Sequence, residues 1–104
     1  MRKSTGILAV ERSAGRPDRC ALEQNYPNPF NPSTTIASYL PEARRVRIAV
    51  YDILGREICL LVDEHSTAGR HTTEFRGDDL GSGVYFCRMD AGDFRAAGKM
   101  LLTR

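Results

Sequence analysis

Residues 45–51 read RVRIAVY, a segment in which apolar side chains recur at every second position. The alternation puts Val46, Ile48 and Val50 on one face and leaves the arginines and the tyrosine for the other. A period of two is the repeat of a strand that is buried on one face and open to water on the other. The segment therefore predicts a β-strand whose valine and isoleucine side chains belong to a hydrophobic core.

Short runs of strand-forming residues follow one another along the rest of the chain, with glycine or polar turns between them. Residues 52–56 form a tight connection with a glycine where a positive φ is expected. The run 57–62 breaks strict alternation, which predicts a β-bulge. Regularly spaced turns between short strands favour an all-β fold, an Ig-like or fibronectin-III-like antiparallel β-sandwich of about seven short strands. The expected strands are residues 34–40, 45–51, 57–62, 70–75, 84–89 and 94–103.

Residues 83–87 read GVYFC and carry the Tyr-x-Cys pattern of an immunoglobulin-type strand. In that pattern the tyrosine hydroxyl bonds back to the preceding turn. We therefore expect Tyr85, Cys87 and Met89 to share one face. Ile36, Tyr85 and Met89 are expected to be mostly buried, together with the apolar face described above.

The length of 104 residues allows a single domain. Residues 1–20 carry five basic and two acidic groups and are expected to be a flexible tail or linker remnant, whereas residues 21–104 form the folded domain. The apolar stretch at 7–10 is shorter than the roughly 7–15 residues of a signal peptide, so we expect no export signal in this chain. No apolar run reaches the roughly 18 residues of a membrane span. The net charge of +2 does not indicate a nucleic-acid partner.

Residues suited to catalysis or metal binding are few. His65 and His71 lack the spacing and the intervening glutamate of a zinc-protease helix; we expect a solvated loop residue and a surface residue at a strand start. The three cysteines form no C-x-x-C pair. Cys59 and Cys87 are expected to be small buried apolar residues, and they can pair only if their strands are neighbours. The sequence thus predicts a protein that is not an enzyme, with no catalytic residue, metal or cofactor.

Residues 25–32 read NYPNPFNP and form a proline-rich block. Asn28 and Asn31 each precede a proline, which favours extended or turn geometry. Their side chains can bond nearby backbone and close Asx-turns, and Tyr26 and Phe30 can pack on the edge of the sandwich. The block is either a rigid linker or a docked arm that covers an edge strand.

The run from residue 22 to residue 36, which contains this block, resembles the opening of the type A C-terminal sorting domain of type IX secretion cargo. The resemblance continues in order through residues 39–41, 50–56, 61–63, 68–71, 80–86 and 99–102. It also extends to the Ig-like domain of flagellar hook-capping proteins. The family-motif positions are Asn25, Tyr26, Pro27, Asn28, Pro29, Phe30, Asn31, Pro32, Asp52, Gly55, Arg56, Gly69, Ser82, Gly83, Val84 and Tyr85.

This resemblance implies a sorting signal rather than a reaction. Domains of this kind sit at the C-terminus of secreted proteins of Gram-negative bacteria, where the outer-membrane type IX translocon recognises them and a sortase-like cysteine protease removes them. The implied function is that of a non-catalytic C-terminal secretion domain that directs an attached cargo and is then cleaved. The implied location is the periplasm in transit, and then the outer-membrane surface or the medium. The N-terminal cargo domain is expected to be missing from this chain.

The final strand is the expected recognition element, because an end strand can pair with the edge of a partner sheet. Within it we expect Met100 and Leu102 to point inward and Leu101 outward. Lys99 is the only lysine after the first three residues. These four residues are the candidates for translocon recognition, with the charge of Arg104 beside them. The alternative is an ordinary final strand of a sandwich.

Two other classes of function remain open. One is a structural Ig-like module of a hook-capping or cell-surface assembly. The other is a carbohydrate-binding module, which usually presents exposed aromatic platforms, whereas this chain has no tryptophan. Export of a fused reporter distinguishes the sorting domain from the structural module. In that test, removal of residues 99–104 is expected to trap the reporter in the periplasm while the domain stays largely folded.

Overall fold

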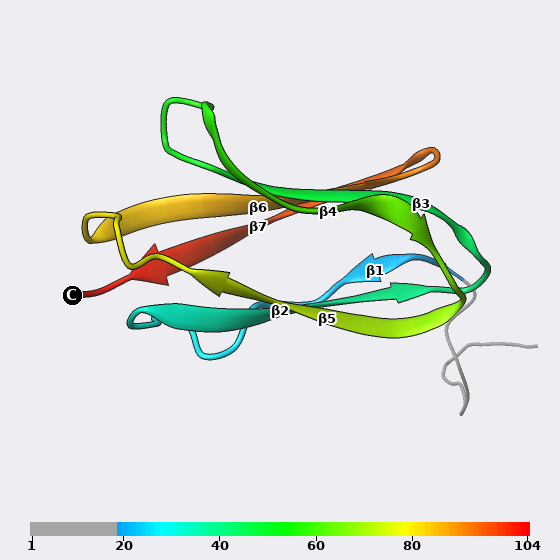
Figure 1. Ribbon diagram of the computed structural model, residues 1–104, viewed down its shortest axis with the longest axis horizontal. Helices are drawn as coiled ribbons and strands as arrows, with labels where there is room; N and C mark the ends of the chain where they lie inside the picture. Colours follow the sequence, from blue (N-terminus) through cyan, green and yellow to red (C-terminus); the bar gives the residue numbers. More distant parts are fainter. Residues whose placement is uncertain (1–18) are drawn as a thin grey trace, which may run out of the picture.

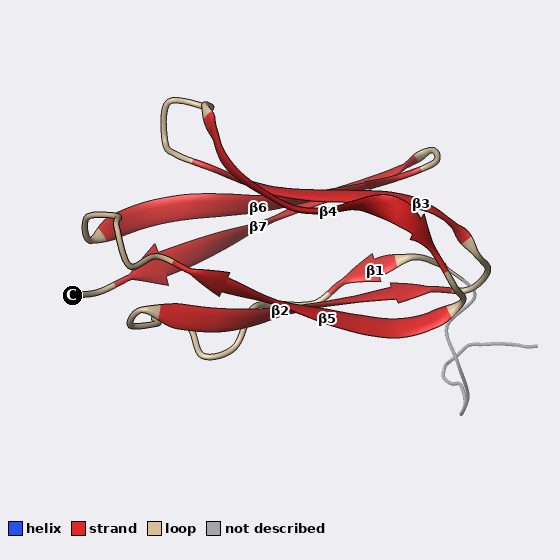
Figure 2. Cartoon of the chain, in the orientation of Figure 1, coloured by secondary structure: helices blue, strands red, loops and turns tan. Residues whose placement is uncertain are grey.

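The computed structural model describes residues 19–104, and this part of the chain consists of strands and connecting loops (Figure 2). Each strand pairing is antiparallel, which confirms the prediction of an all-β antiparallel sandwich. The tail expected at residues 1–20 lies outside the described residues except for its last two positions. The strands are β1 (Ala21–Leu22), β2 (Ser33–Leu40), β3 (Arg44–Tyr51), β4 (Glu57–Ser66), β5 (Gly69–Arg76), β6 (Gly83–Ala91) and β7 (Phe94–Leu102). Among the described residues, no helix has the length and apolar character that crossing a membrane requires.

The strands form two layers that face each other (Figure 1). One layer has the strand order β1-β2-β5 and the other has the order β4-β3-β6-β7. In immunoglobulin constant domains the fourth strand joins the first layer, which gives four strands against three. Here β4 pairs with β3 instead, because the short turn of residues 52–56 folds the chain directly back.

Side chains from both layers meet in one core, and the alternating segment supplies its centre. Val46, Ile48 and Val50 of β3 are at most 3% exposed. Ile36 of β2 and Met89 of β6 are buried with them. These five residues confirm most of the expected core. They also confirm that the alternating apolar side chains of β3 point into it.

Tyr85 is the exception among the expected core residues. It packs against the core as expected, but it is only partly buried, whereas the other five are fully buried. Its hydroxyl donates a hydrogen bond to the carbonyl oxygen of Gly81 at 2.7 Å, which confirms the predicted bond back to the turn. Since that hydroxyl needs a polar partner, the ring lies at the margin of the core. Cys87, two residues on, is buried as expected.

β4 carries the expected bulge and a second one, and it is longer than predicted. Its register with β3 skips Leu61 and Ile58, so that each stands as an extra residue in the bulged strand. Pairing then continues to Ser66, which lies opposite Arg44. His65 therefore lies in a strand and not in the expected loop, because β3 begins early enough to give it a partner. Its side chain is exposed.

Val50 is fully buried between Cys59 of β4 and Cys87 of β6, its register partners on either side. Val50→Ala is expected to lower the free energy of unfolding by about 1–3 kcal/mol, because buried methyl groups are lost and a cavity remains. Urea denaturation measures the change. Val84→Ala is the matched control, since Val84 is half-buried on the outer face of the same sheet. Equal midpoints for the two variants would contradict the assignment of Val50 to the core.

Candidate functional site

The proline-rich arm, residues 23–32, is docked along the sandwich and binds both layers. Tyr26 exchanges two backbone hydrogen bonds with Thr35 of β2, at 3.0 and 2.9 Å. Further along, the N–H of Phe30 donates to the carbonyl oxygen of Leu101 in β7 at 2.9 Å. The arm thus leaves one sheet and reaches the other. This confirms the docked arm, and the interpretation as a linker is wrong.

The arm covers the C-terminal part of the outer edge of β7. The Asn28 Oδ1 atom accepts a hydrogen bond from the N–H of Leu101 at 2.9 Å, and its Nδ2 donates to the carbonyl oxygen of Lys99 at 3.4 Å. The N–H of Thr103 donates to the carbonyl oxygen of Phe30 at 3.0 Å. We expected Asn28 to close a local Asx-turn; it bonds a distant strand instead, because the docked arm places it beside backbone groups that lack a neighbouring strand.

A small polar cluster fixes the path of the arm. Asn25 and Thr34 are 5% and 2% exposed. The Asn25 Nδ2 donates to Thr34 Oγ1 at 3.0 Å and to the carbonyl oxygen of Pro27 at 3.3 Å, and Thr34 Oγ1 donates to that same carbonyl at 2.8 Å. Gln24 Nε2 donates to Asn25 Oδ1 at 2.6 Å and to the Lys99 carbonyl oxygen at 3.2 Å. Buried polar groups require such partners. The partner role of Thr34 was missed, although a threonine at an inward position of an alternating strand was a usable signal.

Of the two aromatic residues of the arm, one is buried and the other is exposed. Phe30 is 1% exposed and meets the ring of Phe75 edge to face, with 5.9 Å between ring centroids. Tyr26 is 80% exposed, so the prediction that it packs on the sandwich edge is wrong. Residues opposite each other in an antiparallel pair share a face, and Tyr26 lies opposite the exposed Thr35.

The other motif residues of the arm are mostly exposed to solvent. Asn31, Pro27 and Pro29 are exposed, and Pro32 is half-buried. The carbonyl oxygen of Pro32 accepts a hydrogen bond from the N–H of Gly77 at 2.8 Å. That bond ties the end of the arm to the loop between β5 and β6.

β7 has one face in the core and one face open to water. Met100 and Leu102 are 1% and 0% exposed, whereas Leu101 is 39% exposed, which confirms the predicted alternation. Lys99 is exposed and makes no ion pair in the described part of the chain. The burial of Met100 and Leu102 argues against the expectation that the last six residues can be removed from a folded domain.

The turn between β3 and β4 is closed by one carboxylate. Asp52 Oδ1 accepts from the N–H groups of Leu54 and Arg56, each at 2.9 Å, and Oδ2 lies 2.8 Å from Arg56 Nε. The Arg56 N–H, with its guanidinium and the Leu54 N–H, holds the pKa of Asp52 below its ordinary value. Gly55 has the predicted positive φ, 83°. Ile53 and Leu54 are 70% and 72% exposed at the tip. The exposure of Ile53 and Leu54 was not predicted from the sequence, although apolar residues inside a tight turn cannot reach the core.

The loop between β5 and β6 holds the end of the chain. Ser82 Oγ accepts a hydrogen bond from the N–H of Arg104 at 2.9 Å. The Arg104 guanidinium donates to three carbonyl oxygens of this loop, those of Gly77, Asp78 and Leu80, at 2.5–3.0 Å. The loop carbonyls fix the position of the Arg104 guanidinium without neutralising it, so its charge beside the last strand stays a prediction.

The remaining motif residues lie at strand starts. Gly69 and Gly83 are the first residues of β5 and β6 and have φ values of 118° and 154°. Val84 is half-buried and lies opposite Leu101 in the β6–β7 pair, on the outer face of the sheet.

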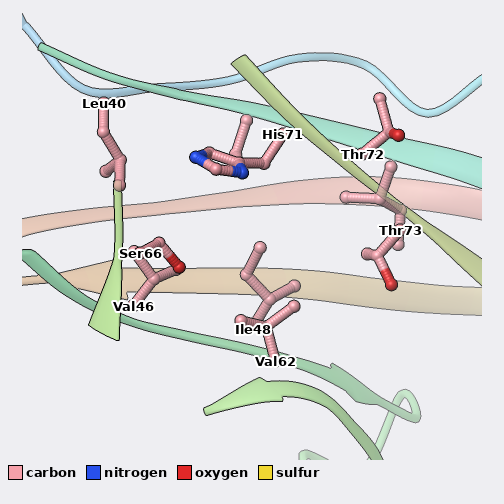
Figure 3. A pocket seen from close by; sticks show the side chains of 10 residues that line it. Leu40, Val46, Ile48, Val62, Ser66, His71, Thr72 and Thr73 are labelled. Carbon is pink, nitrogen blue, oxygen red and sulfur yellow. The ribbon is translucent and has the colours of Figure 1, made fainter. Parts of the chain in front are cut away.

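His71 lies near the start of β5, as predicted, and is half-buried. Its ring points toward the space between the sheets, near Val46 and Ser66 (Figure 3). The ring Nε2 donates to the carbonyl oxygen of Thr67 at 2.7 Å. The void beside it has about 20 Å³, room for one water molecule at most. Within residues 19–104, no group of His, Cys, Asp and Glu side chains is placed to hold a metal ion.

Cys59 and Cys87 both flank Val50, so β3 separates their strands. Both thiols are free. Burial raises the pKa of the Cys87 thiol to about 12, which keeps it protonated and unreactive at neutral pH. Cys87 is buried as expected, whereas Cys59 is half-buried.

A family model described as "Secretion system C-terminal sorting domain" matches residues 24–103. No curated protein matches the chain. The matched range includes the arm from its second residue, all strands from β2 to β7 and the first residue after β7.

Proposed function

The chain belongs to the family of secretion system C-terminal sorting domains, and on that premise we propose that it directs an attached cargo through the outer-membrane type IX translocon and is then cleaved by a sortase-like protease. Family membership gives the role of a C-terminal sorting signal that works with the type IX machinery and is exported to the cell surface or the medium. Passage through the periplasm, the identity of the receptor and the cleavage step belong to the proposal.

The observation that carries the proposal is the double character of β7. Met100 and Leu102 anchor the strand in the core, while Lys99 and Leu101 on the same strand face water. A strand of this kind can be held rigidly and read from outside at the same time.

The docked arm changes how a partner would read this strand. Strand addition uses free backbone groups at a sheet edge. At Lys99, Leu101 and Thr103 those groups already bond the arm. We therefore propose that the receptor reads the outward side chains of Lys99 and Leu101 rather than the backbone edge.

The cleavage site is proposed to precede Cys20. Cys20 and Leu22 pack against the core, and β1 begins at Ala21. A protease needs an extended, accessible segment, which residues packed in this way do not provide. Cleavage before Cys20 would leave the sandwich intact.

A reporter with an export signal, fused to the N-terminus of the 104-residue chain in a host with type IX secretion, tests the proposal. The unmodified fusion is expected to reach the surface or medium. Lys99→Glu and Leu101→Ser are expected to lower the exported fraction about tenfold or more and to leave the reporter in the periplasm, because both side chains are exposed and neither change reaches the core.

Thr72→Glu is the matched control, because Thr72 is exposed on the other sheet. It is expected to be exported normally. An unmodified fusion that stays in the periplasm would refute the sorting role and favour a structural Ig-like module. Normal export of both β7 variants would refute the assignment of Lys99 and Leu101 as the residues that are read.

A further inference from the structure

The exposed apolar side chains of this domain gather on one face. Seven large apolar residues are exposed in the described part of the chain, and five of them lie on the outer face of the four-stranded sheet or on its β3–β4 turn. The five are Ile53, Leu54, Leu60, Phe86 and Leu101. Large apolar groups gathered on one face of a small domain mark an interaction surface more often than scattered single residues do.

The turn presents its two apolar side chains rigidly. In Figure 1 the β3–β4 turn rises from the four-stranded layer, away from the three-stranded layer. The carboxylate of Asp52 holds the N–H groups of Leu54 and Arg56, and the N–H of Gly55 donates to the Asp52 carbonyl oxygen at 3.0 Å. A preformed turn loses little conformational entropy on binding, so Ile53 and Leu54 are suited to fill a pocket of defined shape.

A hollow lies beside this projection. It has about 300 Å³, and its walls include the side chains of Tyr51, Phe86 and Ala97. The Arg88 guanidinium lies 5.8 Å from the centre of the Tyr51 ring, which fixes one wall by a cation–π contact. The surface therefore offers a projecting element and a recess next to each other.

Among residues 19–104, the charges of this face leave Lys99 without an ion-pair partner. Arg56 pairs with Asp52, Arg47 with Glu57, and Arg88 with Asp90. Lys99 lies in register with Phe86 and makes no ion pair among residues 19–104. A partner that covers the face must supply a carboxylate or leave this ammonium group unpaired at the interface.

We infer that the surface formed by Ile53, Leu54, Phe86, Lys99 and Leu101 docks on a folded protein with an apolar pocket next to a carboxylate. The pocket receives the two turn residues, and the carboxylate pairs with Lys99. An anionic lipid surface is bound by clusters of unpaired cations, which this face does not offer. The inference rests on the proposed function, because it names the chemistry of the surface by which the export machinery holds the domain.

The test uses the same reporter fusion with changes in the turn alone. The double variant Ile53→Ser, Leu54→Ser is expected to lower the exported fraction about tenfold or more, since truncating central apolar contacts of an interface has effects of this size. Its urea midpoint is expected to match that of the unmodified chain, because both residues are more than two-thirds exposed. Tyr26→Ser is the control, because Tyr26 is 80% exposed on the other sheet. Lys99→Arg is expected to keep export, since it keeps the positive charge.

The outcomes separate this inference from the proposed function. Failure of the unmodified fusion to be exported refutes the function itself. Export of the turn variant at the level of Tyr26→Ser refutes the docking surface and leaves the function standing. Binding of the purified chain to phosphatidylglycerol vesicles that the turn variant loses would overturn the inference in favour of lipid. Dimerisation in sedimentation that the turn variant abolishes would overturn it in favour of a second copy.

Discussion

A chain that ends at Gly98 is expected not to fold. The missing segment contains Met100 and Leu102, which are 1% and 0% exposed, and removing a buried side chain of this size costs about 2–5 kcal/mol. The arm also loses its partners in β7, and the Arg104 guanidinium leaves the β5–β6 loop. The combined loss reaches the total stability of a small domain, about 5–15 kcal/mol.

Far-UV circular dichroism and urea denaturation of the purified truncated chain measure this result. The full-length double variant Lys99→Gln, Leu101→Ser is the control, because it changes only exposed side chains of the same segment and is expected to unfold cooperatively. A truncated chain with a cooperative transition near that of the control would contradict the prediction. Since a truncation removes the fold together with the signal, loss of export on truncation would not identify what the receptor reads.

Phe30→Ala is expected to lower the free energy of unfolding by about 3–5 kcal/mol. The ring is 1% exposed and packs edge to face on Phe75, so its removal leaves a cavity where the arm meets the core. The backbone of Phe30 is also the link between the arm and β7. The Thr103 N–H donates to the Phe30 carbonyl oxygen, and the Leu101 N–H donates to Asn28 Oδ1 in the same arm. Loosening of the arm is therefore expected to speed amide hydrogen exchange at Leu101 and Thr103.

Urea denaturation and exchange-detected NMR measure the two effects. Tyr26→Ala is the control within the same arm, because its ring is 80% exposed and its loss is expected to stay within about 0.5 kcal/mol. Equal midpoints for the two variants would show that Phe30 does not anchor the arm. Protected amides at Leu101 and Thr103 in Phe30→Ala would show that the arm stays docked without its ring.

The secondary structure and the inward face of the strands were within reach of sequence reasoning because both depend on local patterns. The alternation at Val46, Ile48 and Val50 holds for any sandwich that buries this strand on one side. The same argument correctly placed Met100 and Leu102 inside. The bond from Tyr85 to its turn was also predictable, since both groups lie within a few residues of each other.

The proposed docking surface on the outer face of the four-stranded sheet was only partly predictable from the sequence. Lys99 and Leu101 were named as outward residues from alternation alone. Ile53 and Phe86 were not, although the turn and the strand that hold them were both predicted. The sequence pattern did not show which exposed side chains are neighbours. Alternation predicts that a side chain points outward, but it does not predict which other exposed side chains lie beside it.

The amino-acid sequence by itself determined an all-β domain, the positions of the strands from β2 to β7, their buried faces and the membership of its motif in a family. Only the tertiary structure decided that β4 joins β3, that Phe30 enters the core while Tyr26 faces water, and that the arm occupies the edge of β7. The reason is physical. A strand's pattern is set by its own residues, whereas its neighbour, its free edge and its unpaired charges depend on contacts between segments far apart in the chain. Those contacts are chosen by packing and hydrogen bonding of the whole domain at once.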